Sequence, residues 1–217
     1  MCLIVEKEKL DYWNSLYSSK DFFGSGPTKL AKLAESTFNK KNMKILEIGC
    51  GQGRDAIFFS TLGHDVHAFD ISVNAIDYVK DLKKSLGLEN LHVSVHDVEK
   101  PLPYPDESFD FVYSNLALQF FNLDKLSNII ENISSVAKKD SIFLLSTKKA
   151  GDKYHNFGNK VNDHAFEYKG ITRYFFSEPE LRSALSKYFE IIHFDEDRHV
   201  NLDSTVSVWW KILMRKL

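Results

Sequence analysis

The chain has 217 residues, 43% hydrophobic and 27% charged, a composition typical of a globular domain large enough to bury a substantial core. Its formal net charge of −2 gives no electrostatic reason to expect nucleic acid as a partner. Two cysteines cannot build a disulfide framework, no apolar run has the length of a membrane helix, and the start MCLIVEKEK is too short in apolar residues for a signal peptide. We therefore expect one cytoplasmic domain with no membrane partner.

The segment 1–38 precedes the first predicted strand and is expected to be helical. Trp13 and Tyr17 stand at helical spacing in DYWNSLY, and a loop containing Phe23 follows. Thr28 is a suitable N-cap for the helix TKLAKLAESTF. The aromatic side chains of this segment either wall a ligand site or pack on the edge of the sheet, and both interpretations stay open.

The stretch from Lys44 to Asp55, KILEIGCGQGRD, predicts a strand, a glycine turn and the start of a helix. The apolar run before Gly49 has the length of a strand that is buried on both faces. Gly49, Gly51 and Gly53 then alternate with other residues. This order of elements forms a nucleotide-binding corner, where glycine is needed because a ligand lies against the backbone.

The next apolar run ends at Asp70, and an acid at the tip of the second strand can accept hydrogen bonds from both ribose hydroxyls. Strand, glycines and acid together fit NAD, FAD or S-adenosylmethionine. The glycine spacing separates these ligands, because the third glycine comes one residue earlier than in G-x-G-x-x-G. Glu47 would repel a diphosphate and suits a ligand that carries an ammonium and a sulfonium.

At these residues the chain resembles a known family. ILEIGCGQGRD with the later FDIS is similar to motifs I and II of the class I S-adenosylmethionine-dependent methyltransferases, and the resemblance extends from about residue 40 to the C-terminus. It implies S-adenosyl-L-methionine as the cofactor, and an N-terminal lid in which Trp13 contacts the cofactor while Tyr17 and Phe23 line the substrate side. The cofactor-binding residues implied by the two motifs are Glu47, Gly49, Cys50, Gly51, Gly53, Arg54, Asp70 and Ile71.

Beyond Asp70 the sequence predicts a helix over Val73 to about Leu86, capped by Ser72, and a third strand over Leu91 to Val95. The resemblance implies that Asp97 accepts a hydrogen bond from the adenine amine and that the amide of Val98 meets a ring nitrogen. The alternative for Asp97 is a strand-end residue that forms a turn.

A fourth strand is predicted over Phe111 to Ser114, where the sequence is similar to the family's approach to motif IV. The resemblance places Asn115 near the methionine part of the cofactor, with Gln119 and Phe120 on the substrate side. Gln119 is alternatively an ordinary surface glutamine.

An amphipathic helix over Leu123 to Lys138 and a fifth strand over Ser141 to Thr147 follow. Residues 148–176 are expected to form a long polar loop that recognises the substrate, and His155 and Arg173 are among its side chains that could contact the substrate. None of these residues has the spacing of a metal site, so we expect no metal. Ser177 opens a helix, and strands over Tyr188 to Phe194 and Thr205 to Arg215 form a terminal hairpin.

The predicted fold is a seven-stranded, Rossmann-like α/β sheet, mostly parallel, with a C-terminal antiparallel hairpin and helices on both faces. One methyltransferase domain over 1–217 comprises the lid (1–38) and a core (39–217) with its substrate loop (148–176). Similarity of GQGRDAIFFSTLGHDVHAFDIS to the tellurite-resistance and thiopurine enzymes implies a small-molecule methyl acceptor. We expect the protein to be a monomer or a homodimer.

Three other functions remain open: an NAD(P)-dependent oxidoreductase, a methyltransferase acting on protein or RNA, and an inactive cofactor-binding partner subunit. The sequence predicts no particular catalytic residue, because in-line methyl transfer depends mainly on alignment and on exclusion of water. Cys50 is either a nucleophile or a small side chain at a tight turn, and no paired base stands near it in the sequence.

Overall fold

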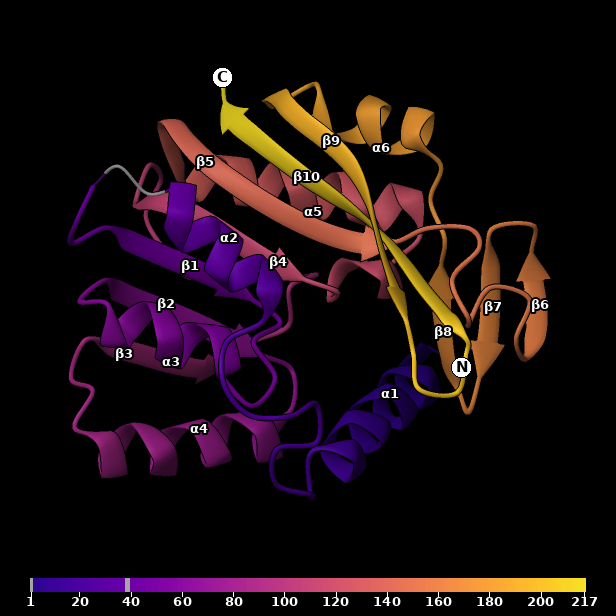
Figure 1. The fold of residues 1–217 in the computed structure, drawn as a ribbon, viewed down its shortest axis with the longest axis horizontal. Coiled ribbons are helices and arrows are strands. Elements are labelled where there is room, and N and C mark those ends of the chain that lie inside the picture. The colour runs from indigo at the N-terminus through magenta and orange to yellow at the C-terminus, as the bar shows by residue number, and fades with distance from the viewer. Residues whose placement is uncertain (1, 38–39) are drawn as a thin grey trace. The chain divides into compact units, whose positions relative to one another are not determined.

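The computed structural model describes residues 2–37 and 40–217. Its main sheet has seven strands in the order β3-β2-β1-β4-β5-β10-β9 (Figure 1). Strand β1 is parallel to β2 and β4, β2 is parallel to β3, and β10 is antiparallel to both β5 and β9. The predicted seven-stranded sheet with a terminal hairpin is confirmed. The strands are β1 (Lys44–Ile48), β2 (Asp65–Asp70), β3 (Leu91–Val95), β4 (Phe109–Asn115), β5 (Ala137–Lys148), β9 (Phe189–Val200) and β10 (Val206–Lys216).

The helices begin where the sequence supplies caps. The side chain of Ser72 accepts from the amide of Ala75, and Gly87 ends the same helix in the left-handed conformation. Ser177 and Glu180 form a capping box at the last helix. The helices are α1 (Cys2–Leu16), α2 (Lys29–Thr37), α3 (Arg54–Thr61), α4 (Val73–Leu86), α5 (Leu123–Val136) and α6 (Glu178–Leu185), with a 3-10 turn η1 (Leu118–Phe120).

The chain forms two compact units. Unit 1 comprises residues 1–100 and 109–113, and unit 2 comprises 101–108 and 114–217. In unit 1, α3 and α4 pack against β2 and β3, with fully buried Phe59, Phe69 and Phe111 in the core. In unit 2, α5 and α6 pack against each other, and Ile133, Phe143 and Phe189 are buried. These apolar side chains hold each unit together by their removal from water.

Residues 148–176 differ from the polar loop that the sequence predicts. They contain a three-stranded antiparallel sheet of β6 (Asn159–Asn162), β7 (Ala165–Tyr168) and β8 (Ile171–Tyr174), seen beside the start of β10 in Figure 1. The pair Tyr168–Ile171 closes a two-residue turn in which Lys169 and Gly170 have φ of 54° and 76°. Positive φ at both positions gives the type of tight turn that suits a twisted hairpin.

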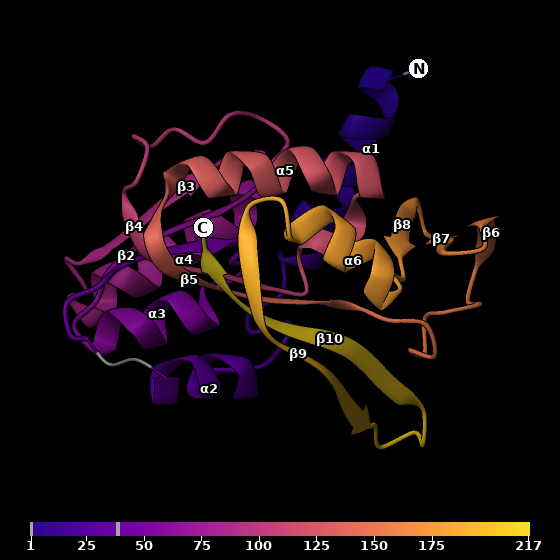
Figure 2. The same cartoon turned by 90° about the horizontal axis from the view of Figure 1, so that it is seen from above.

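The C-terminal hairpin is longer than predicted. Strands β9 and β10 pair from Val200–Val206 to Phe189–Lys216, with one irregularity at Leu213 and Met214 (Figure 2). Residues 195–203 are mostly polar, so apolar alternation in the sequence does not indicate that the hairpin continues through them. Among the described residues, no helix is long and apolar enough to cross a membrane.

Candidate functional site

The glycine turn follows β1 directly and is bound to the end of β2. The amides of Gly49 and Cys50 both donate to the carbonyl of Phe69, at 2.9 and 3.0 Å. Gly53 has φ of 75°, and a Cβ there would lie 2.8 Å from a methyl of Val79. Only glycine fits this position without strain, since both the backbone and the space exclude a side chain. The turn predicted from the sequence is therefore present in unit 1.

Asp70 joins the glycine turn to the start of α4. One carboxylate oxygen accepts from the amide of Gly51 at 2.9 Å, and the other accepts from the amide of Ser72 at 2.9 Å. Burial raises the pKa of Asp70, while the amides of Ser72, Gly51 and Ile71 act in the opposite direction. Each carboxylate oxygen keeps a second lone pair, so Asp70 can still accept from a ligand hydroxyl.

Glu47 is a buried acid with an unsatisfied oxygen. The residue is only 4% exposed, and its Oε2 has no hydrogen-bond partner among the described residues. Burial raises its pKa well above the ordinary value; the charges of Asp55 and Asp70 add to this, and the amide of Ala56 opposes it. A buried acceptor without a partner is costly, which favours a ligand that brings a donor or a positive charge.

Two side chains of the glycine turn point to the N-terminal segment. Gln52 accepts from the amide of Phe22 at 2.9 Å and donates to the carbonyl of Ser19 at 2.8 Å. The guanidinium of Arg54 donates to the carbonyls of Phe23 and, at 2.8 Å, Gly26. Arg54, predicted as a cofactor residue, thus has its side chain occupied in fixing the segment that the sequence analysis treats as a lid.

Asp55 holds the other end of the same segment, a role that the sequence analysis missed. Its carboxylate accepts from the amide and hydroxyl of Thr28 at 2.7 and 2.8 Å, and from the hydroxyl of Tyr113 at 2.7 Å. Thr28 also caps α2, as predicted, by accepting from the amide of Ala31 at 3.1 Å. The only local sign of this role in the sequence is an acid in the first turn of a helix, and the helix dipole explains such an acid equally well.

Tyr17 lies over the glycine turn. A Cβ on Gly51 would stand 2.8 Å from the Tyr17 hydroxyl, and the ring of Tyr17 stacks with Trp13 at 6.1 Å. Phe23 meets Tyr17 edge-on at 6.0 Å but is itself exposed. The backbone carbonyl of Asn14 accepts from Asn74 at 2.8 Å, which holds α1 to the start of α4. The three predicted lid aromatics therefore form one cluster in unit 1.

The end of β3 forms a turn. Asp97 accepts from the amide of Glu99 at 3.0 Å, as expected of a strand-end residue that forms a turn. Val98 is buried. His96, which is not among the residues predicted from the sequence, lies beside them. Its amide donates to the carbonyl of Asp70 at 3.0 Å, and its buried Nε2 has no partner among the described residues.

Asn115 and Gln119 belong to unit 2. Asn115 accepts from the hydroxyl of Ser146 at 2.6 Å, and Leu116 adopts φ of 54°, uncommon for a residue that is not glycine. Gln119 is buried, which overturns its interpretation as a surface glutamine. It donates to the carbonyl of Leu116 at 2.5 Å, and its Oε1 is buried without a partner.

The predicted substrate residues of unit 2 fall into two environments. The guanidinium of Arg173 lies 5.7 Å from the ring centre of Phe120 and 4.8 Å from that of Tyr154. His155 instead packs edge-on against Phe166 and Phe175, at 5.3 and 5.1 Å. Arg173 and Phe120 are therefore neighbours, whereas the ring of His155 contributes to the packing of the small sheet.

A buried ion pair in unit 2 has no counterpart in the sequence analysis. The ammonium of Lys148 lies 2.5 Å from a carboxylate oxygen of Asp152, which also accepts from the amide of Val208 at 2.9 Å. Burial lowers the pKa of Lys148 against the pull of Asp152. Their spacing of four residues would suggest a helix, but here it bridges a strand end and a turn.

The arrangement in unit 1 is that of a Rossmann-like nucleotide-binding domain: a parallel strand, a glycine turn, a helix N-terminus and an acid at the next strand end. The tight turn from Gly49 to Gly53, in which all three glycines have positive φ, and the unsatisfied oxygen of Glu47 fit an adenosyl ligand with a positively charged amino-acid part. The chain belongs to the methyltransferase-domain family, whose model matches residues 39–211.

Named relatives agree with this assignment. The probable S-adenosyl-L-methionine-dependent methyltransferase TehB of Haemophilus influenzae is 29% identical over 126 residues, which are 58% of this chain and 41% of TehB. The malonyl-[acyl-carrier protein] O-methyltransferase of Buchnera aphidicola is 31% identical over 113 residues, 52% of this chain and 42% of that protein. The chain therefore spans less than half the length of each of these two curated relatives. The predicted likeness to the tellurite-resistance type of class I methyltransferase is confirmed.

Solved structures share the fold. A SAM-dependent methyltransferase of Methanosarcina mazei has a TM-score of 0.73 at 22% identity, covering 85% of this chain and 97% of its own. The structure of 1,6-didemethyltoxoflavin-N1-methyltransferase of Burkholderia thailandensis, with its substrate and S-adenosylhomocysteine bound, has a TM-score of 0.67 at 18% identity, covering 86% and 76%.

Proposed function

We propose that this protein is an S-adenosylmethionine-dependent methyltransferase that acts on a small-molecule acceptor. The observation that carries the proposal is the buried Oε2 of Glu47, which has no hydrogen-bond partner among the described residues and lies one strand residue before the glycine turn. The family match and the methyltransferase relatives support the same activity. When bound, S-adenosylmethionine supplies an electrophilic methyl group on a sulfonium.

Residues of unit 1 bind and orient the cofactor in this proposal. Gly51 leaves room for Tyr17 over the turn, Asp70 accepts from the ribose, and Glu47 accepts from the ammonium of the methionine part. Trp13 and Tyr17 limit the access of water to the turn, which strengthens these electrostatic contacts. Asp97 and Val98 are assigned to the adenine.

The same acids disfavour the alternative cofactor. A dinucleotide would bring a diphosphate to the glycine turn, close to Glu47 and Asp70, and like charges repel strongly where water is excluded. In addition, the amide of Gly51 already donates to Asp70 and is not available for a phosphate oxygen. The oxidoreductase interpretation is therefore the weaker one.

A small acceptor is favoured by the side chains of unit 2. Arg173 beside Phe120 and Tyr154 presents a cation together with aromatic surface, which suits a compact aromatic or anionic molecule. Two named relatives act on small or carrier-bound molecules by their descriptions. The predicted contributions of Asn115 and Gln119 to this side remain part of the proposal.

Calorimetry with S-adenosylhomocysteine tests the cofactor assignment. Wild-type protein should bind it, and Asp70→Ala should lose at least about tenfold in affinity because hydrogen bonds to a charged group contribute about 1.5–3 kcal/mol. Asp77→Asn, an exposed acid on α4, is the matched control and should bind as wild type. Binding of NADH in place of S-adenosylhomocysteine would refute the proposal.

The acceptor is tested separately with radiolabelled S-adenosylmethionine. Thiols, chalcogen oxyanions, amines and phenols form one panel, and total tRNA and protein form another. Turnover with a member of the first panel is expected. Methyl incorporation only into tRNA or protein would overturn the small-molecule acceptor while leaving the cofactor assignment intact, and binding without any turnover would point to an inactive partner subunit.

A further inference from the structure

Three side chains with metal-binding chemistry meet at the beginning of strands β2 and β3. Asp65 and His67 are two residues apart on β2, so their side chains project from the same face of the sheet. His92 on β3 is the register partner of His67, and the two imidazole rings lie 4.7 Å apart. The register of the two strands thus gathers one carboxylate and two imidazoles on one face.

The distances between the donor atoms match those of a coordination shell. Oδ1 of Asp65 lies 3.5 Å from Nε2 of His67 and 3.2 Å from Nε2 of His92. One ligand atom from each of the three residues lies within 4.8 Å of the others. In a tetrahedral zinc site with bonds of about 2.0–2.1 Å, ligand atoms stand about 3.3 Å from one another. The carboxylate oxygen already stands at that separation from both imidazole nitrogens.

The cluster is open to an ion from solution. The side chains of Asp65, His67 and His92 are 46%, 19% and 50% exposed. This leaves room for water at a fourth position, as an open three-ligand site requires. Two imidazoles with a carboxylate between them are a donor set that suits zinc and its first-row neighbours better than magnesium or calcium.

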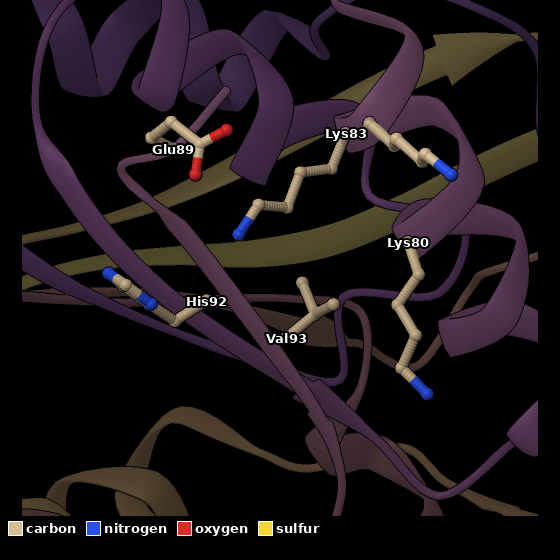
Figure 3. A pocket seen from close by; sticks show the side chains of 6 residues that line it. Lys80, Lys83, Glu89, His92 and Val93 are labelled. Carbon is tan, nitrogen blue, oxygen red and sulfur yellow. The ribbon is translucent and has the colours of Figure 1, made fainter. Parts of the chain in front are cut away.

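Nearby cations bear on how tightly such an ion is held. Figure 3 shows His92 and Val93 extending to opposite sides of β3, with Lys80 and Lys83 on the side of Val93. Lys44 is the register partner of Asp65 on β1, and its ammonium lies 5.4 Å from the ring centre of Phe109. Lys80, Lys83 and Lys84 line the same hollow as His92, so their charges, together with that of Lys44, moderate the affinity.

We propose that Asp65, His67 and His92 form a binding site for a divalent first-row transition metal, with Zn²⁺ as the physiological candidate. The site lies at the start of β2, whereas Asp70 and the glycine turn lie at its end. A strand of this length separates the two by about 16 Å. The metal would therefore join β2 to β3 and stabilise unit 1 rather than take part in the methyl transfer, and the site is independent of the proposed function.

Cobalt spectroscopy on the full chain without a polyhistidine tag tests the site. Titration of Co²⁺ into wild-type protein should produce the intense visible absorption of four-coordinate cobalt, with one equivalent bound, and Zn²⁺ should remove it. His92→Gln should weaken binding by at least about 10–100-fold, the range found for the loss of groups that only orient a metal ligand, because it removes a ligand itself. His199→Gln, an exposed histidine on β9, is the matched control and should titrate as wild type.

Zn²⁺ should also raise the melting temperature of wild-type protein and of His199→Gln but not that of His92→Gln, because a ligand stabilises only a state that binds it. Asp65→Asn provides a second, nearly isosteric test and should lose the cobalt spectrum while its far-UV circular dichroism stays that of wild type. No cobalt absorption in wild-type protein at millimolar Co²⁺, or an unchanged spectrum in folded His92→Gln, would overturn the site.

Discussion

The hydroxyl of Tyr17 lies against the backbone of Gly51, where an added Cβ would stand only 2.8 Å away. This contact places the residue that follows α1 on the glycine turn, so the part of the chain expected to contact a ligand is covered by the chain's own N-terminal segment. Burial raises the pKa of the Tyr17 hydroxyl, and the charge of Asp70 adds to this effect. Tyr17 is therefore neutral at physiological pH and can donate or accept a hydrogen bond.

Gly51→Ala should weaken binding of S-adenosylhomocysteine by at least about tenfold and destabilise the protein by about 1–3 kcal/mol. The residue has φ of 51°, a conformation that costs an L-residue energy, and the new methyl would displace Tyr17. Denaturant unfolding and calorimetry measure the two effects. Gly87→Ala, whose Cβ would meet nothing within 4 Å at φ of 68°, is the control for backbone strain and should keep its affinity.

Glu47→Gln should have opposite effects on stability and on cofactor affinity. Because the pKa of Glu47 is raised in the folded protein, the fold favours the protonated acid, and its contribution to stability is lost as pH rises from the unfolded value through the folded one. The amide variant should therefore be more stable than wild type at neutral pH, with a flatter dependence above about pH 4.5. Urea unfolding across a pH series tests this.

The same variant should bind S-adenosylhomocysteine roughly 10–100-fold more weakly, because it loses a charged acceptor for the ammonium. Equal stability and equal affinity in Glu47→Gln would contradict both the unsatisfied burial and the assigned role. Glu89→Gln serves as the control, since this acid lies in the hollow lined by α4 and β3 rather than at the turn.

Thr28→Ala should destabilise unit 1 by about 1–2 kcal/mol, because it removes the N-cap of α2 and the hydroxyl that donates to Asp55. Thr28→Ser should recover most of the loss. Thr37→Ala, at the other end of α2, removes a hydroxyl that donates only to a carbonyl of its own helix and should change stability little. Chemical denaturation of the three variants measures the loss of stability in each. Equal losses in Thr28→Ala and Thr28→Ser would contradict the role of the hydroxyl.

Lys148→Ala should cost about 3–5 kcal/mol, because it leaves the carboxylate of Asp152 buried without its cation. The side chains of this pair are 9% and 0% exposed. The exposed pair of Lys160 and Asp163, 59% and 83% exposed, offers the comparison, and Lys160→Ala should leave stability almost unchanged. A similar cost for both variants, measured by urea unfolding, would show that burial does not govern the strength of these pairs.

Elements with strong local signals were predicted close to their observed bounds. Helix α4 spans Val73–Leu86 with Ser72 as its N-cap, as the sequence indicated, and Gly87 ends it. The hairpin of β7 and β8 was missed because its turn, Lys169–Gly170, lacks the asparagine or aspartate that usually marks such a turn. The alternative prediction of Gln119 as a surface residue was wrong, because a glutamine after a strand carries no sequence pattern that indicates burial.

The sequence by itself determined the strand, the glycine turn and the acid at Asp70, because each depends on residues that are neighbours in the chain and on backbone geometry that only glycine adopts easily. It also determined the family, through that same stretch. Only the tertiary structure decided which distant residues meet: Tyr17 on Gly51, Thr28 and Tyr113 on Asp55, and His67 beside His92. These contacts arise when strands align in register and helices pack on them, and no spacing along the chain records that alignment.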